Sequence, residues 1–232
     1  MTENVTKNSR RASRGEAALS RDTIIDAAIA LLDSSGENGL TFRALATKLA
    51  TGAGAIYWHV ADKDALFTAA SDVIMARAIG ISLPAATPRQ NIQTLALAVF
   101  EAMDQHPWLG SALSQAPGRL PTVRLLERLG QQVAALGVPA SRQWVAACTL
   151  LNYLLGVGGQ NAANASIARV QDLERMHFLE TLSAAWSQLD AQEYPFTRSV
   201  AAKLREHDDR ADFLAGIDLI VQGMLHNTGT RQ

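Results

Sequence analysis

The sequence predicts an all-α protein in which a small three-helix unit precedes a larger helical domain. Three observations support this fold class. Alanine and leucine are abundant, whereas aromatic residues make up only 6% of the 232 residues. Apolar residues recur at helical spacing along most of the chain. The seven prolines lie mostly at the boundaries between these periodic segments. A chain of this length can bury the core of one large domain, or of a small and a larger one.

Residues 1–19 are rich in Asn, Ser and Arg and have no periodic apolar face, so we expect a flexible basic arm. Its cations include Lys7, Arg10, Arg11 and Arg14. Two interpretations stay open. The arm contacts phosphates or the minor groove of DNA, as arms of other DNA-binding folds do, or it is a solvated terminus without a function.

The first helix is predicted to begin at Ser20, a preferred N-cap residue, and to end near Gly36. Thr41 is the predicted N-cap of a second helix, and a turn containing Gly52 and Gly54 follows it. The expected buried positions of these two helices are Ile24, Ala28, Leu31 and Leu32 in the first and Phe42, Leu45, Ala46 and Leu49 in the second.

A third helix is expected over about residues 53–59, with Ile56 and Val60 facing inward. It places Tyr57, Trp58 and His59 side by side, and three neighbouring rings cannot all face a core at helical spacing. One side of this helix must therefore meet something other than its own protein. A helix-turn-helix that presses its second helix into the major groove of DNA accounts for the pattern.

Asp62 is the predicted cap of a fourth helix, which continues to about residue 79 and crosses the predicted boundary between a 20–67 domain and a 68–228 domain. Residues 191–208 are polar and are expected to be an irregular connection. The larger domain is predicted to contain helices at about 89–105, 108–113, 122–136, 141–165, 166–190 and 209–225.

Two of these helices carry more apolar surface than one neighbour covers. The 141–165 helix is nearly free of charge, which requires burial on more than one side. Glycine costs about 1 kcal/mol in a helix interior relative to alanine, so several small residues indicate close helix packing, or else a poor helix that breaks there. The small residues are Gly156, Gly159 and Ala163. The last helix instead carries a wide apolar stripe, and the residues of this stripe are Phe213, Ile217, Ile220 and Met224.

The pattern across residues 20–67 is specific because it fixes residue types over about 30 positions. It comprises Gly39-Leu40-Thr41, Arg43, Leu45-Ala46, Leu49, Ile56 through Val60, Asp62-Lys63 and Ala65-Leu66. In these residues the chain resembles the N-terminal DNA-binding domain of the tetracycline-repressor (TetR) family of transcriptional regulators. The resemblance implies a homodimer, held by a four-helix bundle from the last two long helices of each subunit, which agrees with their wide apolar faces.

The resemblance also implies the residues that contact DNA. Each of them taken singly has an ordinary alternative, such as a solvated cation or a half-buried ring, but together their spacing favours a DNA surface. The implied contacts are Thr41, Arg43, Ala53, Gly54, Ala55, Tyr57, Trp58, His59 and Lys63. Because Ala53, Gly54 and Ala55 have almost no side chain to read bases, we expect readout to depend on close backbone approach, thymine methyl groups, Arg43 and DNA shape.

In the larger domain we expect the helices of residues 89–165 to enclose a pocket for a small organic effector. A cluster of aromatic and sulfur side chains with a few polar tips is typical of such pockets, although each position alone could be ordinary core. The candidates are Phe100, Met103, His106, Trp108, Gln115, Trp144, Cys148, Asn152, Tyr153, Met176, Phe178 and Trp186, with Gln115, Asn152 and His106 as polar anchors.

The five histidines show no pair at the spacing of metal ligands, so we predict no metal and no cofactor, and a mostly apolar, aromatic or drug-like effector. The resemblance implies that effector binding shifts the fourth helix, so that the two recognition helices no longer match major grooves about 34–36 Å apart. Repression is the default function in the family.

Alternatives remain at this stage. The protein could activate transcription, respond to a protein effector, or be a ligand-binding scaffold dimer without sequence-specific DNA binding. An enzyme is disfavoured because no nucleophile–base pair or phosphate loop is present and the single cysteine, Cys148, lies in an apolar helix. One cysteine, no apolar run of about 18 residues and a polar N-terminus lead us to expect a soluble, cytoplasmic protein without a membrane partner.

Overall fold

The computed structural model describes residues 19–81, 87–115, 118–170 and 175–226, and these form helices without any strand, which confirms the all-α prediction. Most of the predicted basic arm therefore lies outside the described residues; Leu19, its last residue, packs against the core. The helices are α1 (Arg21–Gly39), α2 (Phe42–Lys48), α3 (Ala53–Tyr57), α4 (Lys63–Ile79), α5 (Pro88–Gln105), α6 (Leu109–Gln115), α7 (Leu120–Ala135), α8 (Ala140–Val170), α9 (Arg175–Ser187), α10 (Pro195–Val200), the 3₁₀ helix η1 (Ala201–Glu206) and α11 (Asp209–His226).

The three predicted N-caps of the first unit are confirmed. The side chains of Ser20, Thr41 and Asp62 each accept a hydrogen bond from the backbone amide three residues later. The end of α1 differs from the prediction, because the helix resumes after Gly36 and runs to Gly39. Gly36 itself has φ of 63°, a left-handed conformation that glycine adopts readily, so it marks a kink rather than the end of the helix.

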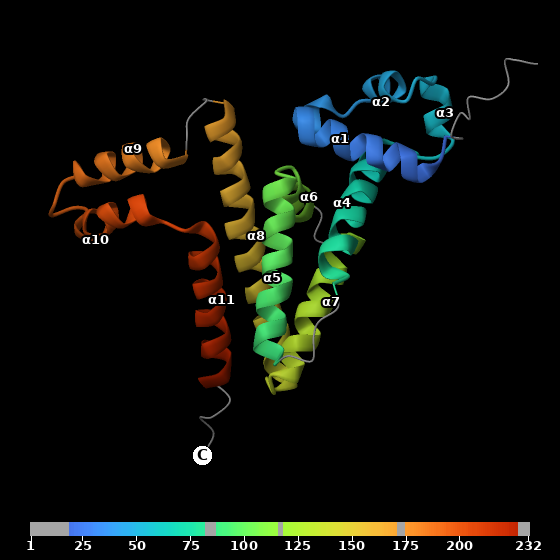
Figure 1. The fold of residues 1–232 in the computed structure, drawn as a ribbon. Helices are drawn as coiled ribbons and strands as arrows, with labels where there is room; N and C mark the ends of the chain where they lie inside the picture. Colours follow the sequence, from blue (N-terminus) through green and yellow to red (C-terminus); the bar gives the residue numbers. More distant parts are fainter. Residues whose placement is uncertain (1–18, 82–86, 116–117, 171–174, 227–232) are drawn as a thin grey trace, which may run out of the picture.

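Helix α4 belongs to both parts of the molecule. It packs against α1, and further contacts join it to α5, α6 and α7. The buried side chains of α1–α3 and those of the larger domain form one continuous cluster through residues of α4 such as Leu66, Ala70 and Ile74. In Figure 1, α4 descends from beneath α1–α3 into the helical bundle.

Helices α5, α7, α8 and α11 form the bundle of the larger domain (Figure 1), with α8 packing on α5, α6, α7 and α11. Tyr153 joins α8 to α11, since its hydroxyl donates to the Phe213 carbonyl at 3.2 Å and occupies the space that a side chain at Gly216 would need. Burial raises the pKa of this Tyr153 hydroxyl, with the Asp212 charge adding to the effect, so it remains a donor at neutral pH.

The structure corrects two predicted dimer-interface positions. Phe213 and Ile217 are each only 1% exposed within a single chain, so they face the chain's own core and have no surface to offer a partner. The backbone of Gly159 lies close to α6, because a Cβ at Gly110 would be 3.0 Å from the Gly159 Cα, but a Cβ on Gly159 itself would meet nothing within 4 Å, so Gly159 stays an interface prediction. An apolar stripe cannot distinguish an internal face from an external one, which explains the error. Gly156 and Ala163 are exposed.

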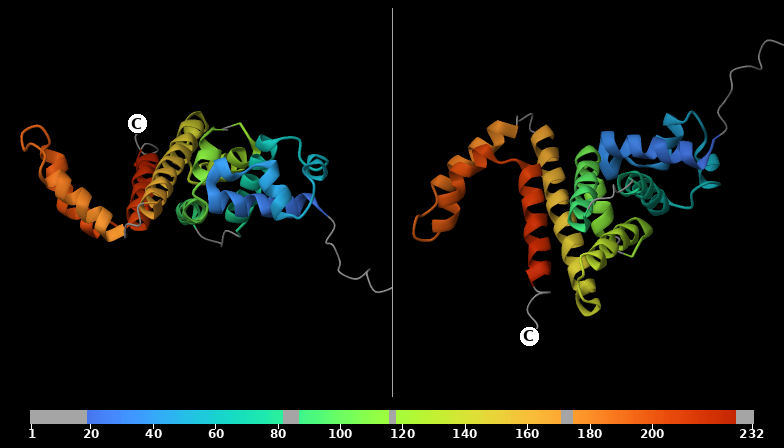
Figure 2. Two further views of the ribbon diagram at one scale, coloured as in Figure 1. Left: turned by 90° about the horizontal axis from the view of Figure 1, so that it is seen from above. Right: turned by 60° about the horizontal axis from the view of Figure 1, so that its bottom comes forward.

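The predicted irregular connection at residues 191–208 is wrong, because α10 and η1 occupy most of it. Together with α9 they form an arm, residues 175–206, in which α9 packs mainly against η1 and α10 and only slightly against α8. Figures 1 and 2 show this arm and the α1–α3 unit on opposite sides of the bundle. No described helix has the length and apolar character to cross a membrane.

Candidate nucleic-acid interface and cavity

Helices α2 and α3 form a compact pair whose inner side is sealed. Leu45 of α2, Ile56 of α3 and Val60 in the turn after it are all buried, as predicted. Because α3 is only five residues long, these few anchors fix which of its residues face outward.

Aromatic side chains lie on the outward face of this pair. Trp58 is 90% exposed, far more than a ring of its size needs to be for structural reasons, and Tyr57 is 55% exposed. The Tyr57 ring stacks on Phe42 of α2 with ring centroids 4.2 Å apart, which fixes its orientation. Trp58 and His59 follow the end of α3 rather than belonging to it, since the helix ends at Tyr57.

The predicted polar contacts lie at the starts of α2 and α4. Arg43 and His59 are exposed. Thr41 is also exposed while its hydroxyl caps α2. Lys63 is exposed too, and its ammonium donates to the Glu37 carbonyl of α1 at 2.7 Å, which leaves two of its three donors for another acceptor.

The N-terminal end of α3 is open, as a close approach to DNA requires. A Cβ placed on Gly52 or Gly54 would meet nothing within 4 Å, so neither glycine is needed to relieve crowding within the chain. Ala53 and Ala55 are partly buried beside them. The predicted DNA contacts thus lie on α2, α3, the turn after α3 and the first residue of α4.

One group of polar contacts joins the α1–α3 unit to the larger domain through α1. We term these contacts the α1 junction. Oδ1 of Asp33 accepts a hydrogen bond from Nε1 of Trp108 at 2.7 Å and lies 2.7 Å from Nδ1 of His106. The hydroxyl of Ser111 donates to the carboxylate of Glu37 one turn further along α1. These contacts join the C-terminal part of α1 to α6 and to the turn before it.

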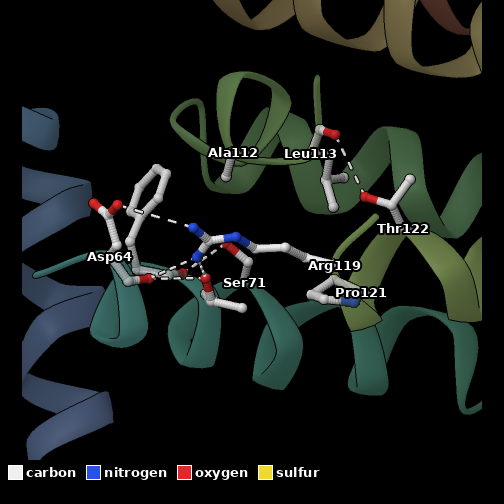
Figure 3. Close-up of a pocket in the computed structure, with 9 residues that line it drawn as sticks. Asp64, Ser71, Ala112, Leu113, Arg119, Pro121 and Thr122 are labelled. Atoms are coloured by element: carbon white, nitrogen blue, oxygen red, sulfur yellow. Dashed lines mark hydrogen bonds and ion pairs between the residues drawn. The ribbon is translucent and has the colours of Figure 1, made fainter. Parts of the chain in front are cut away.

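A cavity of about 190 Å³ lies between α4, α6 and α7 (Figure 3). Arg119, at the N-terminal end of α7, reaches across it to α4: its Nη1 donates to the Asp64 carbonyl at 3.1 Å and to the Thr68 hydroxyl, and its Nη2 lies 3.9 Å from the Asp64 carboxylate. We term these contacts the α4 junction. The lining consists of Asp64, Phe67, Thr68, Ser71, Ala112, Leu113, Arg119, Pro121 and Thr122.

None of the eleven predicted effector-contacting residues whose side chains the structure describes is in this lining. Trp108 and His106 point to Asp33 at the α1 junction, so their polar tips are already used. Phe100 stacks on Phe213, and Met103 fills the space beside Gly158, which makes both ordinary core.

The remaining predicted pocket residues are divided between α8 and the arm. Trp144, Asn152 and Met176 are exposed at the surface of the protomer. The side chain of Gln115 lies outside the described residues. Cys148, Tyr153, Phe178 and Trp186 are partly buried.

One feature of the sequence could have indicated a residue of this cavity. Arg119 comes at the start of a helix, where the macrodipole disfavours a cation, so it needs acceptors from elsewhere in the fold. The other polar lining residues, Thr68, Ser71 and Thr122, also satisfy backbone carbonyls, and nothing in their sequence context marks them.

Comparison with known proteins points to one family. Residues 24–70 match the family described as "Bacterial regulatory proteins, tetR family". The class D tetracycline repressor of Escherichia coli is 49% identical over 70 residues, which are 30% of this chain and 32% of the repressor. The chain thus matches about a third of the length of that relative, and the match gives no information about the repressor's effector-binding part.

Two solved structures extend the similarity over the whole fold. The transcriptional regulator SCO7222 of Streptomyces coelicolor, described as a TetR, is 45% identical with a TM-score of 0.80, over 90% of this chain and 98% of that one. BioQ, solved with its natural double-stranded DNA operator, is 25% identical with a TM-score of 0.59, over 89% of this chain and 98% of that one.

Proposed function

We propose a function on the premise that the chain belongs to the tetR family of bacterial regulatory proteins, which are DNA-binding regulators and not enzymes. The protein is a repressor that binds a palindromic operator as a homodimer and is released by a small organic effector. The single observation that carries the DNA-binding part is the outward face of α3 and of the turn after it, where Tyr57 is 55% and Trp58 is 90% exposed although Ile56 of α3 is fully buried. A helix held this firmly with large rings in solvent is suited to lie against a duplex.

On this surface we assign the roles by chemistry. Arg43 reads a guanine edge or holds a phosphate, while Thr41, Tyr57, His59 and Lys63 hold phosphates and Trp58 lies along the backbone. The open N-terminal end of α3, Ala53 to Ala55, approaches base edges directly, and indirect readout of DNA shape supplements it.

The homodimer is supported by large apolar side chains that one protomer leaves in solvent on two adjacent helices. These are Trp144 and Val145 of α8 and Leu219 and Leu225 of α11. Exposed apolar patches of this kind mark protein interfaces. Gly156, Gly159, Ala163, Ile220 and Met224 remain interface candidates. We expect the partner to cover the arm residues Met176 and Phe196 as well.

The cavity between α4, α6 and α7 is where we place the effector, because α4 carries the α1–α3 unit and is the wall of the cavity nearest to it. An effector that separates α4 from α7 changes the spacing of the two α3 helices in the dimer. Coupling of this type amounts to about 1–3 kcal/mol and is reciprocal, so operator DNA must weaken effector binding by the same factor.

The direct test is footprinting of the purified protein on DNA upstream of its own gene and its neighbours, at a stated salt concentration. We expect one protected palindromic site, and a promoter fusion then distinguishes repression from activation. Arg43→Ala should weaken specific binding by about 1–3 kcal/mol. Salt-sensitive binding that is equal on all sequences would overturn the proposed function.

The dimer has a separate test in Gly156→Arg. A Cβ at Gly156 meets nothing within 4 Å, so an arginine there leaves the protomer intact, but it places a charge in the proposed interface. We expect the variant to sediment as a monomer and to lose operator binding. Gly130→Arg on α7 is the matched control, since Gly130 is also unobstructed, and it should remain a dimer.

A further inference from the structure

The cavity between α4, α6 and α7 combines an apolar wall with one cation. Phe67, Ala112 and Leu113 supply the apolar wall, and Arg119 is the only basic residue among the described residues of the lining. Figure 3 shows the Arg119 side chain extending from the start of α7 towards Asp64, with Ala112 and Leu113 on the α6 side. A cavity of this composition suits a molecule that has an apolar body and one anionic end.

Arg119 has hydrogen-bonding capacity left over. Of its five N–H donors, those on Nη1 bind the Asp64 carbonyl and the Thr68 hydroxyl. Among the described residues, Nε and Nη2 make no hydrogen bond, because the nearest carboxylate oxygen, Oδ2 of Asp64, is 3.9 Å from Nη2. Nε and Nη2 form one side of the planar guanidinium, and that side matches the two oxygens of a carboxylate.

The competing carboxylate of Asp64 is held weakly. Its side chain is 82% exposed, so it returns to water at little cost when another anion takes its place. The hydroxyls of Ser71 and Thr122 lie in the same lining and are both almost fully buried. One arginine and neutral hydroxyls favour a singly charged carboxylate over a phosphate, which requires more positive charge.

We propose that this cavity binds a small organic carboxylate, which pairs with Nε and Nη2 of Arg119 and places its apolar part against Phe67 and Leu113. An apolar cavity of about 150 Å³ is known to hold benzene, so about 190 Å³ accommodates an aromatic ring with a carboxylate. The ligand displaces Asp64 and loosens the α4 junction. The claim that the cavity binds a carboxylate does not depend on the proposed function. The claim that this carboxylate is the effector rests on the proposed function.

The test is a calorimetric titration of the full-length protein, without DNA, with benzoate, with its neutral isostere benzamide, and with inorganic phosphate. Benzoate should bind about tenfold tighter than benzamide, because only the anion makes charge-assisted hydrogen bonds with Arg119. Arg119→Gln should reduce benzoate affinity to that for benzamide. Asp64→Asn should strengthen benzoate binding a few-fold by removing the competing anion.

Arg124→Gln is the matched control, since Arg124 also joins α7 to α4, through an ion pair with Asp72 at 2.8 Å, but does not line the cavity. It should bind benzoate as the wild type does. Equal wild-type affinity for benzoate and benzamide, no benzoate binding, preference for phosphate, or an equal loss in the Arg119 and Arg124 variants would each overturn the carboxylate site. Failure to find an operator would overturn only the proposed function, because this titration contains no DNA.

Discussion

The α1 junction and the α4 junction both attach the α1–α3 unit to the larger domain, yet they are built in opposite ways. At the α1 junction, Asp33 is held at 2.7 Å by two partners, one of which, Trp108, is buried. At the α4 junction, Arg119 reaches an exposed carboxylate at 3.9 Å beside a cavity. The first contact is suited to fix the α1–α3 unit to α6, and the second to be exchanged for a ligand.

The largest effect is expected from breaking the α1 junction. Asp33→Ala leaves the buried Trp108 indole without an acceptor, and should lower the free energy of unfolding by about 2 kcal/mol. Urea denaturation at one fixed protein concentration measures this, because oligomerisation makes apparent stability concentration-dependent.

Asp26→Ala is the matched control on the same helix. Asp26 forms an ion pair with Arg77 at 3.8 Å, with both side chains 67% exposed, so its loss should cost less than about 0.5 kcal/mol. Equal losses in the two variants would remove the distinction between a fixed junction and an ordinary surface pair.

An intermediate effect is expected from α6, which contributes Ser111 to the α1 junction and lines the cavity beside the α4 junction. Gly110 allows α6 to lie against α8, since a Cβ there would be 3.0 Å from the Gly159 Cα. Gly110→Ala should push α6 outward and destabilise the protein by about 1 kcal/mol, and it should also change benzoate affinity because Ala112 and Leu113 move with α6. Gly130→Ala, in an open helical position, should instead stabilise by up to about 1 kcal/mol.

The smallest effect on stability is expected at the α4 junction. Arg119→Gln should change the free energy of unfolding by less than about 1 kcal/mol, since the guanidinium is 44% exposed and its ion pair is long. Its consequences should appear in carboxylate binding instead. A stability loss as large as that of Asp33→Ala, in the same urea experiment, would show that Arg119 is a structural clamp.

The predictions from sequence succeeded where the signal is local. Ser20, Thr41 and Asp62 cap helices because a cap needs only an amide three residues away. The exposure of Tyr57 and Trp58 followed from three neighbouring rings at the end of one short helix, which cannot all face a core. Residues 191–208 failed because two short helices held by α9 leave little periodic pattern of their own.

The candidate site shows the same division. The outward residues of α2 and α3 could be named from the sequence because local helix geometry sets their faces. The use of His106 and Trp108 could not be named in this way, because the polar tips of both side chains pair with Asp33, more than 70 residues away in sequence. The effector contacts stay a prediction. Phe213 and Ile217 were likewise assigned to an interface although they fill the protomer's own core.

By itself, then, the sequence determined an all-α chain, the caps of its first helices and an exposed face on α3, since these depend on hydrogen bonds and periodicities within a few residues. Only the tertiary structure decided which apolar faces are internal, and only it brought Arg119 of α7 to Asp64 and Thr68 of α4 beside a cavity. The physical reason is that burial and the pairing of distant polar groups depend on how helices pack, and helix packing is not encoded in the spacing of residues along any one of them.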